Sequence, residues 1–219
     1  MQCLNICGDA SNADPARLSG EAVNDEFVTT LDEVDSKIGS LTVSLCKVIL
    51  GFVYEEWCSV KKNLPTIGKY IAEIEGYFTI GFVLTWSAAS HYEIYHTDGI
   101  AKHNRQGRRA HRKVDKWATS GTEMLVGPNT FLHAMQSLCV KRAPVEQVEV
   151  MFEQAAAACA AGRCRFFEAL ASERLARFFL REEPNAMKRS QYLTRAATLY
   201  RSWGAVAKAT ALEKQMVRI

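Results

Sequence analysis

Apolar side chains recur at helical spacing along most of this chain, and one stretch of the pattern occurs twice. Residues 151–163 and 192–204 superpose at an offset of 41 residues, the distance from Met151 to Tyr192. Four apolar positions coincide: Phe152 with Leu193, Ala155 with Ala196, Ala156 with Ala197, and Cys159 with Tyr200. Their i, i+3, i+4, i+7 spacing defines one face of an α-helix. A unit of about 40 residues predicts a helical repeat of HEAT-like length.

The N-terminal half shows the same periodicity without an obvious repeat. It predicts a short amphipathic helix at Asp25–Ile38 and a longer one that Ser40 caps and that continues through Val60. Pro65 is expected at the first position of the next helix, where proline is favoured. The apolar run TIGFVLTWSAA is interpreted as a fully buried helix, since no other strand is available to pair with it.

Proline and glycine divide the C-terminal half into helices. Gly127-Pro128-Asn129 is expected to form a loop and a helix start. Pro144 and Pro184 are expected to open the two copies of the repeat, and Gly204 to break the second copy before a last helix. The segment Arg163–Arg181 is apolar on two sides, which predicts a helix packed between two neighbours.

These patterns predict an all-α fold, a TPR/HEAT-like helical-repeat (α-solenoid) array of antiparallel helix pairs. The array is expected over residues 25–219 and is clearest over 144–217. Residues 1–24 are rich in Asn, Asp, Ser, Ala and Gly without a sustained period, so they are predicted to be a disordered tail.

Charge is distributed unevenly along the chain. The net charge is +3, yet residues 1–40 carry eight acids against Arg17 and Lys37, whereas residues 102–116 carry seven Lys or Arg against Asp115. Such asymmetry indicates either a tail that folds over the basic segment or an outside partner for it. The candidate polyanion contacts are Lys102, Arg105, Arg108, Arg109, Arg112 and Lys113.

Composition favours a cytoplasmic protein. Seven cysteines are scattered without the spacing of a secreted scaffold, and Cys46, Cys139 and Cys159 lie on apolar helix faces, as reduced thiols do. The N-terminus lacks the basic start and apolar run of a secretory signal. The apolar passage Tyr77–Ala89 is shorter than the ~20 residues that span a bilayer, so no membrane segment is expected.

Candidate catalytic and metal-binding residues do not form a recognisable constellation. His91, Glu93 and His96 are close in sequence, but five helical steps place the two histidines roughly 140° apart, so they do not share a face. Cys3 and Cys7 lack a second pair of ligands for zinc. Cys58, Cys164 and the five histidines supply a nucleophile and a base without a motif that joins them. No metal, cofactor or enzymatic activity is therefore predicted.

Several segments resemble a known family. They are similar to the TPR-like helical region of large multidomain signalling proteins, in which a protein-kinase-like domain and a STAND-type ATPase precede the array and histidine-kinase modules often follow. The resemblance covers roughly residues 40–217. Its motifs are FVLTWSA, HRKVDKWA, NTFLHAMQSL, MFEQAAAAC, EALASERLARFFL and YLTRAATLYRSWGAVAK.

The resemblance implies a helical array and a role in signalling, but not the activities of the neighbouring domains. No G-x-x-x-x-G-K-[ST], H-R-D or D-F-G motif occurs, so kinase and ATPase activities do not carry over. The chain is expected to be a free-standing scaffold or a fragment of a longer signalling protein.

Two functions follow from these patterns. The first is a non-catalytic scaffold whose concave surface binds a protein or peptide partner, as helical solenoids commonly do. The alternative is binding of nucleic acid or an acidic partner through residues 102–116.

Overall fold

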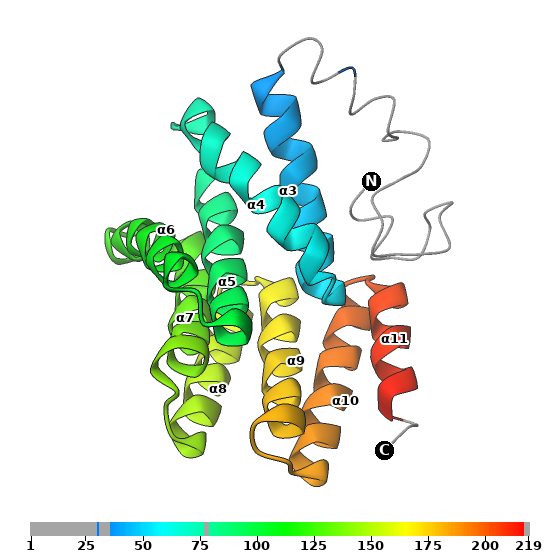
Figure 1. Cartoon of the computed structure of the whole chain (residues 1–219). Helices are drawn as coiled ribbons and strands as arrows, with labels where there is room; N and C mark the ends of the chain where they lie inside the picture. The colour runs from blue at the N-terminus through cyan, green and yellow to red at the C-terminus, as the bar shows by residue number, and fades with distance from the viewer. Residues whose placement is uncertain (1–29, 31–35, 77–78, 217–219) are drawn as a thin grey trace. The chain divides into compact units, whose positions relative to one another are not determined.

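The computed structural model describes Thr30, residues 36–76 and residues 79–216. These residues are all-α, with nine α-helices packed as consecutive antiparallel pairs and no strand among them (Figure 1). The predicted all-α class is therefore confirmed. The predicted tail at 1–24 and nearly all of the predicted helix at Asp25–Ile38 lie outside the described residues.

The chain divides into two compact units, Met1–Ala110 and His111–Ile219, and each is considered separately. The first unit contains α3 (Lys37–Tyr54), α4 (Trp57–Tyr70), a 3₁₀ turn (Ile71–Ile74), α5 (Ile80–Asp98) and the first half of α6 (Ala101–Thr119). The second contains the rest of α6, a 3₁₀ turn (Glu123–Leu125), α7 (Val126–Gln136), a π-helical turn (Ser137–Lys141), α8 (Val145–Ala161), α9 (Arg165–Arg181), α10 (Ala186–Ser202) and α11 (Val206–Met216).

Two predicted helix starts in the first unit are wrong. The cap of α3 is Ser36, whose side chain accepts a hydrogen bond from the backbone N–H of Gly39, and Ser40 lies inside the helix. Pro65 lies inside α4 instead of opening a helix. The helix of Ser40 also does not continue to Val60, because Glu55 takes a left-handed conformation, φ +64°, and ends α3.

The apolar segment around Trp86 forms α5, so the prediction of a buried helix is confirmed. Burial on all sides explains why this segment shows no polar face. Among the described residues, α3 alone is long and apolar enough to cross a membrane by length and composition. The core helix of a soluble protein passes the same test, and α3 packs along α4 with half of its length buried.

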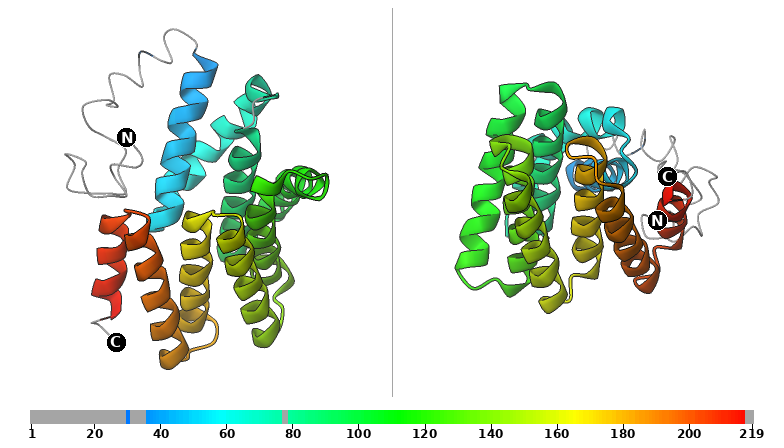
Figure 2. Two further views of the ribbon diagram at one scale, coloured as in Figure 1. Left: turned by 180° about the vertical axis from the view of Figure 1, so that it is seen from behind. Right: turned by 90° about the horizontal axis from the view of Figure 1, so that it is seen from below.

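Helices α7 to α11 of the second unit each pack on the next along the chain (Figure 2). All eight positions that coincide in the two copies of the sequence pattern are buried, four on α8 and four on α10. The repeated face is thus a core face in both helices. Helix α9 lies between them, as its two apolar sides predicted: Phe167 contacts Phe131 of α7, and Phe179 stacks on Tyr192 of α10.

The predicted boundaries of the second unit hold with two exceptions, at Pro184 and at Gly127-Pro128-Asn129. Pro144 is the N-cap of α8, Asn185 rather than Pro184 caps α10, and Gly204, φ +90°, separates α10 from α11. Gly127-Pro128-Asn129 does not form a loop but the first turn of α7. Proline is tolerated there because the first N–H groups of a helix have no partner within the helix.

Candidate functional site

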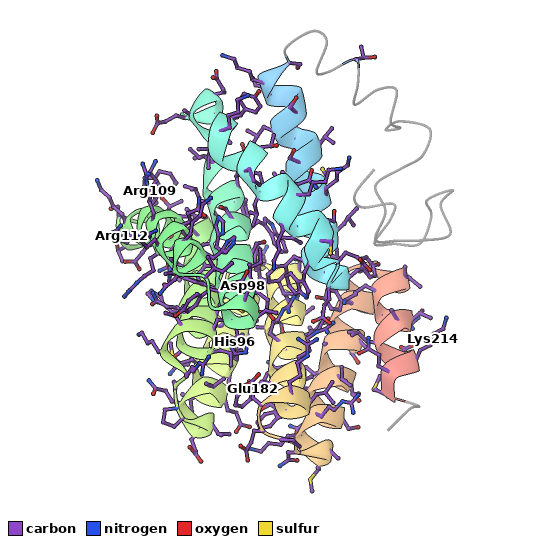
Figure 3. All side chains as sticks on the ribbon, viewed as in Figure 1. His96, Asp98, Arg109, Arg112, Glu182 and Lys214 are labelled. Carbon is purple, nitrogen blue, oxygen red and sulfur yellow. The ribbon has the colours of Figure 1, made fainter. Side chains whose placement is uncertain are left out.

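The exposed side of α6 carries a dense set of cations. At about 100° per residue these side chains fall within an arc of roughly 140°, and at 1.5 Å per residue they extend over about 21 Å. We call this surface the α6 basic face; it consists of Lys102, Arg105, Arg108, Arg109, Arg112, Lys113 and Lys116, all exposed. It contains all six of the predicted contacts, and Lys116 is its seventh member. Figure 3 shows Arg109 and Arg112 projecting from the helix.

Cations of the basic face are paired differently from those on helices α8 to α11. On α8 to α11, cations contact carboxylates across helices, for example Lys188 with Glu149 and Arg195 with Glu153 at 2.5 and 2.7 Å. Lys113 has a further interaction within the structure. Within the described ranges, none of the other six cations of the basic face forms an ion pair with a carboxylate. Six positive charges therefore lie in solvent without a described counter-ion.

The opposite side of α6 is packed closely in the first unit. Gly107 faces the buried ring of Tyr92 on α5, and a Cβ at this glycine would lie 2.9 Å from two of the ring carbons. The turn into α6 is fixed by Gly99, φ +70°, whose N–H donates to the carbonyl of Tyr95, and by Asp98, whose side chain accepts from the N–H of Ile100. One face of α6 is thus anchored while the other presents charge.

Two histidines form a contact beneath the N-terminal half of α6. His91 of α5 and His103 of α6 approach with their Nδ1 atoms 2.9 Å apart, so one ring donates a proton and the other accepts it. Burial, together with the nearby charges of His103 and Lys102, lowers the pKa of His91 from 6.5 to about 4. Burial also lowers the pKa of His103, against the opposing effect of Asp98. Both rings are therefore neutral at physiological pH.

A second polar cluster lies beneath the C-terminal half of α6, within the second unit. Nε2 of His111 and Oδ1 of Asn129 are 3.2 Å apart, and Asn129 donates to Asp115, which also contacts His133 at 3.1 Å. Burial and the neighbouring His133 lower the pKa of His111 to about 4, although Asp115 and Asn129 act in the opposite direction. The cluster fixes the packed face of α6 on α7.

The expected metal and nucleophile candidates are not brought together. His91 contacts His103 rather than His96, and no group of three or more His, Cys, Asp or Glu in the described chain is arranged to hold a metal. Burial raises the pKa of the Cys164 thiol, so it is protonated at neutral pH and is a weak nucleophile. Cys58 is exposed as a free thiol on α4.

A buried ionic cluster in the second unit was not predicted as such. Glu173 of α9 is fully buried and accepts hydrogen bonds from Lys208 of α11 at 2.7 Å and from the Tyr200 hydroxyl of α10 at 2.9 Å. Arg177, four residues further along α9, donates to the same carboxylate. Although burial opposes ionisation, these cations hold the pKa of Glu173 at about 2. The cluster joins three helices, and its Glu173, Tyr200 and Lys208 are buried from solvent, which suits a structural role.

Glu173 could be paired with Arg177 from the sequence, because they lie four residues apart. Lys208 lies 35 residues after Glu173 on another helix. The sequence pattern of that helix shows Lys208 only as a residue between apolar positions. No local signal identifies such a partner.

Comparison with protein-family models, curated proteins and solved structures gives no match. The function of the chain therefore has to be inferred from the α6 basic face and the helices that carry it.

Proposed function

We propose that this chain is a non-catalytic helical scaffold that binds an acidic protein partner through the α6 basic face. The observation that carries the proposal is the set of exposed cations on one side of α6 that have no described carboxylate partner. Clustered charge of one sign attracts a partner of the opposite sign and accelerates the encounter. A protein partner is favoured over single-stranded nucleic acid, because Trp117, the aromatic residue of α6, is half-buried and the basic face offers no stacking platform.

The scaffold is proposed to be a TPR/HEAT-like array, with α8–α9 and α10–α11 as successive repeats. Support comes from direct contacts between α8 and α10, which stand in equivalent positions of the two copies. Glu149 contacts Lys188 and Tyr192, and Glu153 contacts Arg195, at separations of 39, 43 and 42 residues. These separations bracket the 41-residue repeat, as expected when equivalent helices of adjacent repeats lie side by side.

The resemblance to the helical region of STAND-type signalling proteins supports a role in signalling and a cytoplasmic location. Binding through a charged helix requires neither a cofactor nor a metal. We accordingly propose that the chain acts by assembling proteins, either alone or as part of a longer signalling protein.

The experiment measures binding of a fluorescent polyglutamate peptide to the full chain as salt is varied. Replacing Arg108, Arg109, Arg112 and Lys113 by Gln should weaken binding at least about tenfold at low salt and flatten its salt dependence. A matched variant neutralises four exposed cations outside α6, namely Lys62, Lys141, Arg163 and Lys214. This variant has the same net charge as the α6 variant, but it should bind the peptide nearly as tightly as the unaltered chain does.

Two outcomes decide against the proposal. Equal weakening by both variants would show that net charge, rather than the α6 basic face, attracts the peptide. Binding of a DNA duplex of equal charge, tighter than the peptide and lost in the α6 variant, would assign the surface to nucleic acid instead.

A further inference from the structure

We infer that residues 1–35 dock on the α6 basic face and compete with the outside partner, so that the chain carries its own inhibitor. This inference rests on the proposed function, because it uses the same surface. It assigns to that surface an occupant supplied by the chain itself.

Charge complementarity identifies the occupant. Residues 1–35 contain eight acids and a single base, Arg17, for a net charge of −7. Since the whole chain has a net charge of +3, residues 36–219 carry +10. Six of the acids fall within residues 21–35, where no Lys or Arg occurs: Glu21, Asp25, Glu26, Asp32, Glu33 and Asp35. The strongest acidic run of the sequence therefore matches the strongest basic surface of the structure.

The length of the segment permits the contact. Thirty-five residues can extend up to about 115 Å, several times the ~21 Å over which the basic face runs. Residues 1–35 join the described structure at Ser36, the cap of α3, which belongs to the same unit as the first half of α6. Reach therefore does not limit docking, and the segment is long enough to place several carboxylates along the helix.

Tethering makes weak contacts sufficient. An exposed ion pair contributes only about 0–1 kcal/mol, and salt screens it. A segment joined through a flexible linker, however, meets its site at an effective concentration in the millimolar range. Several weak pairs then occupy the basic face until a more highly charged partner displaces the segment. Inhibition of this kind is partial and reversible and decreases as salt rises.

The test uses the full chain and the polyglutamate probe at low salt. Changing Asp25, Glu26, Asp32 and Glu33 to their amides should tighten probe binding by roughly tenfold, within the range of ordinary coupling between sites. The gain should disappear at high salt, where the ion pairs of residues 1–35 are screened. A synthetic peptide of residues 1–35 should also displace the probe from the unaltered chain.

A matched variant separates docking from net charge. It changes four exposed acids outside residues 1–35, Glu123, Glu146, Glu182 and Glu183, to Gln, which raises the net charge equally. If both variants tighten binding to the same extent, the inference is overturned. If neither changes probe binding while the α6 variant abolishes it, residues 1–35 do not dock but the proposed function stands. If the α6 variant binds the probe normally, the proposed function itself fails.

Discussion

The Glu173 carboxylate illustrates how a single residue can fix the packing of three helices. It is wholly buried between α9, α10 and α11, and Lys208 beside it is only 2% exposed. A buried ion pair adds little to stability when compared with a well-packed apolar pair, but removal of one member leaves the other charge uncompensated. The cluster therefore specifies the register of α11 more than it strengthens the array.

Replacement of Glu173 by Gln should destabilise the chain by about 3–5 kcal/mol, because Lys208 would remain buried without its carboxylate and Arg177 would lose its partner. Urea unfolding monitored by circular dichroism measures the loss. The control is Glu213→Gln, which breaks an exposed pair with Arg201 and should cost less than about 1 kcal/mol. Similar losses in the two variants would mean that Glu173 is not a buried charge.

The buried histidines make stability depend on pH. His91 and His111 have pKa values of about 4 in the fold against 6.5 for a solvated histidine, so between these pH values the unfolded chain binds more protons than the folded chain. Stability must then fall as pH falls through this window, by roughly 2 kcal/mol per histidine between pH 7 and pH 5. Thermal unfolding across this range should show a decrease that His91→Gln and His111→Gln each reduce. A flat profile for the unaltered chain would contradict this account.

At the scale of the element, the sequence predicts the existence of helices with a regular apolar face, but it predicts several helix ends at the wrong residue. Helices α8 to α11 follow from their periodicity, and α11 is the last helix predicted after Gly204. Ser40 and Pro65 are typical terminal signals, yet each lies within a helix. Gly127-Pro128-Asn129 forms the first turn of α7, so the predicted helix start is right and the predicted loop is wrong. Packing of a long apolar face outweighs the local preference of one polar or turn-forming residue.

Glycine substitutions test how closely α6 packs on α5. Alanine normally stabilises a helix by about 0.5–1 kcal/mol relative to glycine. Gly68→Ala in α4 should show that gain, because nothing lies within 4 Å of the added Cβ. Gly107→Ala should instead destabilise the chain by about 1–3 kcal/mol, since its Cβ would overlap the buried Tyr92 ring. A stabilising Gly107→Ala, measured by thermal unfolding beside Gly68→Ala, would show that the two helices are loosely packed.

For the molecule as a whole, the distribution of charge could be read from the sequence, whereas the pairing of buried polar side chains is seen only in the structure. The six cations predicted as contacts all lie on the exposed side of α6, because a basic residue with a long side chain seldom occupies a core position. The contacts of His91 with His103 and of Glu173 with Lys208 join different helices and have no fixed sequence spacing. The surface could thus be predicted, whereas the interactions that hold its helices in place could not.

The last two helices are expected to be needed for the integrity of the second unit. In an array of repeats each helix pair covers its neighbour. Helix α10 packs on α9, where Phe179 stacks on Tyr192, and Leu175 and Phe179 of α9 are 1% and 2% exposed. Loss of that cover removes about 1.5–3 kcal/mol for each large apolar side chain, and it removes the Tyr200 and Lys208 partners of Glu173. Ending the chain after Glu183 should therefore give an aggregating or partly unfolded protein.

A milder change to the same interface provides the comparison. Leu193→Ala in the full chain removes one buried side chain of α10 and should lower stability by about 2–5 kcal/mol while leaving the protein monomeric. Size-exclusion chromatography and thermal unfolding of both proteins measure the difference. A chain ending at Glu183 that is monomeric and has an unchanged thermal midpoint would contradict this prediction. Helix α9 would then be stable without the cover that repeats supply to one another, so α10 and α11 would not be stacked repeats.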